Sequence, residues 1–199
     1  MSTYGGTSWL LDYRRTWRPK SENLAEAVTN LFKRKEKALL LKISRAAWFD
    51  SECRCMESAF SGTMSDEFIE TLSCHARSNA ESEPPAMTKT TAEIIFKVQK
   101  TNGETEIKLR VLDEQAPLPF DLRRKYKVLA ATSTCAVFKI AETITGEFLC
   151  ALWGVVDAHH NDEDDCFNAI ERLCLQPLTD LFHDRANCGE QFNMTEVLN

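Results

Sequence analysis

Apolar residues recur at helical spacing in three stretches of the first half of the chain. In 21–37 they share one helical face behind Ser21 as N-cap, with glutamates early and lysines late, the order that the helix dipole favours. The stretches 48–62 and 63–77 are spaced similarly, and Gly62 stands where a C-cap would. The residues on these faces are Leu24, Val28, Leu31 and Phe32, then Trp48, Phe49, Cys53, Met56 and Phe60, then Phe68, Ile69 and Leu72. The spacing predicts N-terminal helices, while 38–43, ALLLKI, fits either a continued helix or a buried strand.

The pattern changes to strict alternation on both sides of Asn102 and Gly103. This dipeptide is typical of a two-residue type I′ turn, which joins two antiparallel strands. The turn and the apolar alternation select the same register independently. The expected facing pairs are Val98 with Ile107, Phe96 with Leu109, and Ile94 with Val111. The sequence therefore predicts a hairpin over 94–111.

A second hairpin and a final helix are expected downstream. Ala136, Phe138 and Ile140 alternate before a turn, and the almost continuously apolar run 148–156 is typical of a strand covered on both faces. Beyond an acidic loop, the spacing of Phe167, Ile170 and Leu173 predicts a helix; a further helical piece is expected from Pro177, carrying Leu178, Leu181 and Phe182.

The order of these elements predicts an α+β fold. N-terminal helices precede a four-stranded antiparallel sheet of two hairpins, and the C-terminal helix packs on that sheet. The expected parts are a basic, aromatic arm at 1–20, a helical region at 21–77, a linker at 78–91 that holds Pro84 and Pro85, the sheet with its helix at 92–189, and a tail at 190–199.

Composition indicates a folded protein of 199 residues, with 43% hydrophobic and 27% charged residues. The first residues lack the pattern of a secretory signal, and no window is apolar enough to span a bilayer. We therefore expect a cytoplasmic or nuclear protein without a membrane partner. In a reducing compartment most of the eight cysteines would be buried small hydrophobes rather than disulfides.

Charge is segregated along the chain, although the net charge is −6. Residues 1–45 hold ten Lys and Arg against four Asp and Glu, whereas 131–199 hold three against twelve. Such asymmetry favours polar partners or the mating of unlike parts in an assembly.

The basic arm has two interpretations. Its apolar residues could dock on a protein partner, because large aromatic side chains dominate interface energetics. Alternatively its cations could bind phosphates while an aromatic ring stacks on a base, together with a second cluster around Tyr126, although the negative net charge opposes this use. The docking residues are Trp9, Leu10, Leu11 and Trp17; the nucleic-acid candidates are Tyr13, Arg14, Arg15, Trp17, Arg18, Lys20, Arg123, Arg124, Lys125 and Lys127.

Metal and catalytic sites are less favoured. Cys53, Cys55, Cys74 and His75 have the residue types of a zinc site, but Cys53 and Cys55 are one residue closer than the usual ligand pair. The acidic segment 157–165, with His159 and His160, could bind a divalent ion but fits the N-terminus of a helix better. Phosphate-binding, nucleophile-elbow, zinc-protease and dinucleotide motifs are absent, so no metal, cofactor or catalytic residue is assigned.

The sequence thus favours a non-catalytic protein-interaction module, an adaptor or a subunit of a larger assembly, with other protein subunits as partners and a possible homodimer. A regulatory or viral nucleic-acid-binding factor is the alternative. An enzyme with a cysteine nucleophile ranks third.

Overall fold

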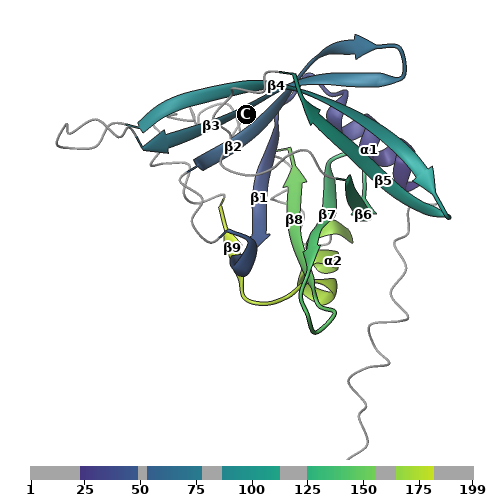
Figure 1. Ribbon diagram of the computed structural model, residues 1–199, viewed down its shortest axis with the longest axis vertical. Coiled ribbons are helices and arrows are strands. Elements are labelled where there is room, and N and C mark those ends of the chain that lie inside the picture. Colours follow the sequence, from purple (N-terminus) through teal and green to yellow (C-terminus); the bar gives the residue numbers. More distant parts are fainter. Residues whose placement is uncertain (1–22, 49–52, 78–86, 113–124, 156–164, 182–199) are drawn as a thin grey trace, which may run out of the picture.

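The structure is a closed antiparallel barrel. The computed structural model describes residues 23–48, 53–77, 87–112, 125–155 and 165–181. Strands dominate this part of the chain, with two α-helices and one 3-10 turn (Figure 1). The barrel strands are β1 (Ala38–Ser44), β2 (Cys53–Met64), β3 (Glu67–Arg77), β4 (Met87–Thr101), β5 (Glu104–Val111), β6 (Lys125–Ala131), β7 (Cys135–Glu142) and β8 (Phe148–Gly154).

From β2 to β8, strands that follow one another in the sequence are adjacent in the sheet. The strand order runs from β2 to β8 and returns to β1, which pairs with both β8 and β2. Closure rests on two residue pairs, Ala38 with Ser58 and Leu39 with Glu57. A short strand, β9 (Leu178–Asp180), pairs with the far end of β1, where the 3-10 turn η2 (Arg45–Ala47) begins. This up-and-down arrangement leaves no long edge exposed among the eight barrel strands.

The predicted fold class is therefore wrong. Strands β2 and β3 occupy the stretches in which helices were expected, and β9 replaces the helical piece after Pro177. In β2 the register shifts between Arg54 and Glu57, around the positive φ of 51° at Cys55, and shifts again between Phe60 and Gly62. These bulges interrupt the two-residue alternation that identifies a strand in sequence. In β3 the buried Glu70 stands between Phe68 and Leu72 on the inward face, so the apolar alternation typical of a strand is interrupted there.

Both predicted hairpins form. In β4–β5 the pairs are Val98 with Ile107, Phe96 with Leu109 and Ile94 with Val111, as expected. The turn residues Asn102 and Gly103 have φ of 53° and 81°, as a type I′ turn requires. In β7–β8, Phe138 faces Ala151.

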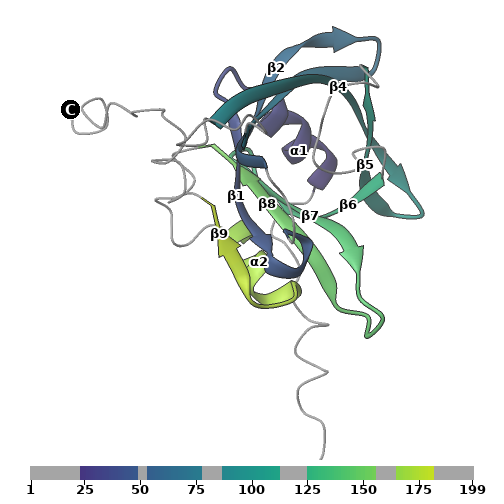
Figure 2. The ribbon, with the colours of Figure 1, turned by 60° about the vertical axis from the view of Figure 1, so that its left-hand side comes forward.

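The described residues contain two α-helices, α1 and α2, and they lie on different parts of the barrel. Helix α1 (Leu24–Phe32) begins after Asn23, whose side chain accepts a hydrogen bond from the Glu26 amide; Ser21 lies outside the described residues. It contacts β2 and β4 to β7 and so covers one end of the barrel (Figure 2). The run ALLLKI forms β1 and does not extend the helix. Helix α2 (Asp165–Leu173) packs outside β6, β7 and β8.

Disulfides fasten α2 to the barrel wall. Cys135 of β7 is bonded to Cys166, and Cys150 of β8 to Cys174, with Cα–Cα distances of 6.2 and 5.8 Å. Cys55 and Cys74 are also disulfide-bonded. Among the cysteines that the structure describes none is free, so the expectation of reduced thiols is wrong for them.

Some predicted parts fall outside the described residues. These are the arm at 1–20, the tail at 190–199 and most of the linker, whose last residues, 87–91, instead begin β4. None of the helices within the described ranges is long and apolar enough to cross a bilayer.

Candidate ligand cavity

The barrel encloses a cavity of about 230 Å³. Its wall is formed by the inward residues of β1 to β8, which alternate with outward ones along each strand. A small barrel of eight strands is just wide enough to be filled by side chains or to hold one small ligand. Here the side chains leave space in the middle.

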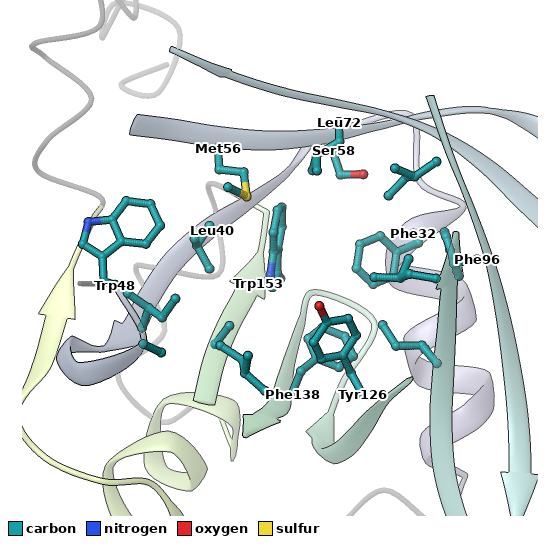
Figure 3. A pocket seen from close by; sticks show the side chains of 17 residues that line it. Phe32, Leu40, Trp48, Met56, Ser58, Leu72, Phe96, Tyr126, Phe138 and Trp153 are labelled. Atoms are coloured by element: carbon teal, nitrogen blue, oxygen red, sulfur yellow. The ribbon is translucent and has the colours of Figure 1, made fainter. Parts of the chain in front are cut away.

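Aromatic rings surround much of this space (Figure 3). Phe32 of α1 lies at one end, with its ring centroid 5.0 Å from that of Phe96 and 6.1 Å from that of Phe138. Trp48, which follows η2, lies at the other end. The full lining is Phe32, Leu40, Ile43, Ala47, Trp48, Met56, Ser58, Leu72, Ile94, Phe96, Ile107, Leu109, Tyr126, Phe138, Ile140, Ala151 and Trp153. The wall is thus suited to an apolar molecule.

Hydroxyl groups interrupt the apolar wall at two positions. Tyr126 of β6 is buried, and its ring stands in the wall opposite Ser58 of β2 (Figure 3). Ser58 Oγ donates a hydrogen bond of 2.8 Å to Glu70 Oε2. Glu70 is 1% exposed, and burial raises the pKa of its carboxyl to about 7, although the bond from Ser58 acts in the opposite direction.

A second buried glutamate, Glu57, has the opposite environment. It faces outward from β2 and is 4% exposed, and Oε1 accepts hydrogen bonds from Lys37 Nζ at 2.9 Å and Lys89 Nζ at 2.8 Å. Burial alone would raise the pKa of Glu57, but the bonds from Lys89 and Lys37 outweigh it and the pKa is lowered. Glu57 is therefore a charged link between β1, β2 and β4 on the outside of the barrel.

Most of the sequence-predicted site residues lie outside the described ranges. This holds for the arm residues from Trp9 to Lys20, for Arg123 and Arg124, and for His159 and His160. Lys125 is exposed at the start of β6, and Lys127 forms an ion pair with Glu104 of β5. Tyr126, placed by the sequence in a basic cluster, instead lines the cavity.

The zinc alternative finds no support in the described residues. Cys55 and Cys74 are disulfide-bonded, and no group of three or more potential ligands comes together in the ranges that the structure covers.

Sequence reasoning missed the cavity. Its lining comes from all eight strands and α1, so no local motif contains it. One residue could have pointed to it: Glu70 is a carboxylate among Phe68, Leu72 and Cys74, at the spacing of one strand face. A charge at such a position is costly and requires an explanation.

Comparison with known proteins adds to this geometry. No protein-family model and no curated protein matches the chain. Among solved structures, japanin from Rhipicephalus appendiculatus bound to cholesterol superposes with a TM-score of 0.55 and 10% sequence identity, over 75% of this chain and 93% of that one. The fold resembles that of a lipocalin. At this identity the likeness concerns the fold alone.

These findings correct the functional predictions. An interaction module, an assembly subunit or homodimer, and a nucleic-acid-binding factor were inferred from the segregated charge and the basic, aromatic arm, whereas the chain forms a closed barrel around an apolar cavity and resembles a ligand-bound barrel. That neighbour was solved with bound cholesterol, which is compatible with the expectation of a non-catalytic protein.

Proposed function

We propose that this protein binds a small, largely apolar molecule inside its barrel. The observation that carries the proposal is the cavity itself, whose wall combines aromatic and aliphatic side chains with very few polar groups. The cholesterol bound to japanin, a barrel of similar fold, supports the same reading.

The size of the cavity limits the ligand. The cavity volume of about 230 Å³ lies below the usual range for pockets that hold drug-sized ligands. The expected ligand therefore has a compact body of few heavy atoms, unless side chains of the wall move on binding.

The disulfides support action in an oxidising compartment, since such bonds persist in secreted and extracellular proteins and are rare in the cytosol. The cytoplasmic or nuclear location expected from the sequence stays a prediction.

Filling the cavity tests the proposal. Binding of the neutral fluorescent probe N-phenyl-1-naphthylamine would be titrated to the wild type and to Ala151→Phe, which projects a ring into the cavity from β8. We expect affinity to fall by at least about tenfold, because the added ring occupies the ligand's space. Thermal unfolding would be measured in parallel.

Ser133→Phe is the matched control, because Ser133 is exposed in the turn between β6 and β7. It adds a similar ring outside the barrel and should bind the probe as the wild type does. A wild type that binds neither the probe nor the smaller phenylethyl compounds described below, or an Ala151→Phe protein that binds the probe equally well, would refute binding inside the barrel.

A further inference from the structure

Glu70 is a buried carboxyl with an unused acceptor. Its Oε2 atom accepts the hydrogen bond from Ser58, but Oε1 has no hydrogen-bond partner. Within the part of the chain that the structure describes, Oε1 is the one buried side-chain oxygen or nitrogen in this state. Leaving such an atom unpaired is costly in a folded protein, so its presence calls for a partner.

This carboxyl adjoins the cavity. Glu70 alternates with Leu72 on the inward face of β3, and across the sheet it faces Ile94 of β4. Leu72, Ile94 and Ser58 all line the cavity. Glu70 is not itself a lining residue, and its carboxyl lies behind the wall formed there by β2, β3 and β4, bonded to the Ser58 hydroxyl that does line the cavity.

Among the residues that the structure describes, no cation is paired with Glu70. The charged residues of β2, β3 and β4 that flank it point to the outer face and pair there: Glu57 with Lys37 and Lys89, Glu67 with Arg110, and Lys97 with Asp66. Glu93 of β4 is exposed, and Lys33, just beyond α1, lies over the Phe68 ring at 4.8 Å. The raised pKa of Glu70 has only burial as its cause and is opposed only by the bond from Ser58.

Together these contacts fix the hydrogen-bonding character of the site. When Glu70 is ionised, Ser58 gives its only hydroxyl hydrogen to Oε2, so Ser58 Oγ can act toward the cavity only as an acceptor. Oε1 of Glu70 is a second acceptor beside it. In this ionised state a ketone, an ether or a hydrocarbon gains no hydrogen bond from the pair, whereas a donor group does.

Resting on the ligand-binding function proposed above, we propose that Ser58 and Glu70 form the polar anchor of the cavity and select a small apolar molecule that carries a hydrogen-bond donor. A hydroxyl and an amino group share this chemistry. A protonated amine would also provide a cationic partner for the Glu70 carboxylate, and the aromatic rings of the cavity wall favour a cation.

A matched series of ligands tests the anchor. The compounds 2-phenylethanol, 2-phenylethylamine, ethylbenzene and 2-phenylethyl methyl ether share an aromatic body and differ in the head group, which is a donor in the first two only. Their affinities would be measured by calorimetry on the wild type. We expect at least one donor compound to bind roughly ten- to a hundredfold more tightly than ethylbenzene and the ether, the range expected for a hydrogen bond to a charged acceptor.

Variants assign the preference to the anchor. The double variant Ser58→Ala with Glu70→Leu removes both acceptors and should reduce the preference for the donor to less than about threefold while ethylbenzene binds as before. Ser58→Ala alone leaves both Glu70 oxygens without a donor, so it should keep a preference for the donor compounds. Glu57→Gln, on the outer face of β2, is the control and should keep the preference. If the double variant does not fold, the nearly isosteric Glu70→Gln decides the result, because it removes the titrating carboxyl and should abolish any rise of amine affinity with pH.

The pH dependence separates the two donors. An alkylamine stays protonated through the neutral range, so its affinity should rise steeply as Glu70 ionises with pH increasing through about 7. The affinity of an alcohol should change much less. Preferred binding of the amine and preferred binding of the alcohol would each support the anchor. The pH dependence shows which of the two head groups Ser58 and Glu70 select.

Other outcomes refute the proposal separately from the function. If the fluorescent probe binds but the four compounds bind equally, or the preference survives both substitutions, the anchor is wrong and the apolar cavity stands. If neither the probe nor any compound binds, the ligand-binding function fails as well.

Discussion

The two faces of the β7–β8 wall are packed differently. On the outer face, Val137 and Leu152 are fully buried beneath α2, whose Ala169 and Ile170 are fully buried as well, and two disulfides cross the contact. On the inner face, Phe138 and Ala151 border open space. We call the outer contact the α2 side, and the interior of the barrel, together with the strands β1 to β4 that complete its wall, the cavity side. In this barrel the close-packed core lies on the outer side of the wall, which leaves the inside available for a ligand.

The largest expected effect comes from breaking the α2 side. Replacing Cys150 and Cys174 by alanine, or Cys135 and Cys166, opens a loop of 24 or 31 residues. Each pair should lower the free energy of unfolding by about 3–4 kcal/mol, because the unfolded chain gains freedom. Urea unfolding measures this loss.

The same variants should still bind the fluorescent probe under conditions in which they remain folded, since neither disulfide borders the cavity. A folded variant that no longer binds would show that the α2 side shapes the interior, contrary to the division made here.

The next effect is on the cavity side and depends on pH. The folded state holds the proton of Glu70 up to a pKa of about 7, whereas the unfolded chain releases it near 4.5. Its contribution to stability is therefore complete below about pH 4.5 and is lost as pH rises through about 7. Between about pH 5.5 and pH 8 the loss should be about 2 kcal/mol. Thermal unfolding of Glu70→Gln over this range should show a flatter pH dependence.

Glu57→Gln gives the opposite test, because the pKa of Glu57 is lowered by its two lysines. This variant should lose stability at neutral pH, and the difference from wild type should shrink on acidification. If both glutamine variants behave alike, the carboxyls do not differ as their contacts imply.

The smallest effect compares one small enlargement on each side. At Gly154 an added Cβ would lie 2.9 Å from Leu41 Cδ1 and 3.1 Å from the Thr134 carbonyl oxygen, so Gly154→Ala should destabilise by about 1–3 kcal/mol. Ala151→Val points into the cavity and should stay within about 1 kcal/mol of the wild type. Equal losses in chemical denaturation would contradict the contrast in packing.

The same contrast explains which elements could be predicted from the sequence. On the α2 side, α2 and β7–β8 were predicted correctly because dense packing requires apolar residues at regular intervals, and a strand covered on both faces is apolar throughout. The β4–β5 hairpin was also found, because turn chemistry and alternation agree.

On the cavity side the sequence misled. Two bulges break the period of β2, and Glu70 interrupts the apolar face of β3, so both strands were predicted to be helices. The barrel closes because β1 pairs with β2, and no local pattern in the sequence of either strand predicts that pairing. The candidate site was missed for the same reason, although Glu70 marked its position as a charge on an otherwise apolar face.

Closure of the barrel also bears on how long a ligand stays inside. The seam between β1 and β2 rests on two residue pairs, whereas β2 and β3 are joined by nine pairs in the described residues and β3 and β4 by ten. Leu40, Met56 and Ser58 of the cavity wall stand beside this seam. Local opening begins where the fewest hydrogen bonds must break. The dissociation rate of a bound molecule would then depend on how often β1 and β2 separate. The residence time of the molecule would change with the stability of this seam even if the residues that contact the molecule stayed the same.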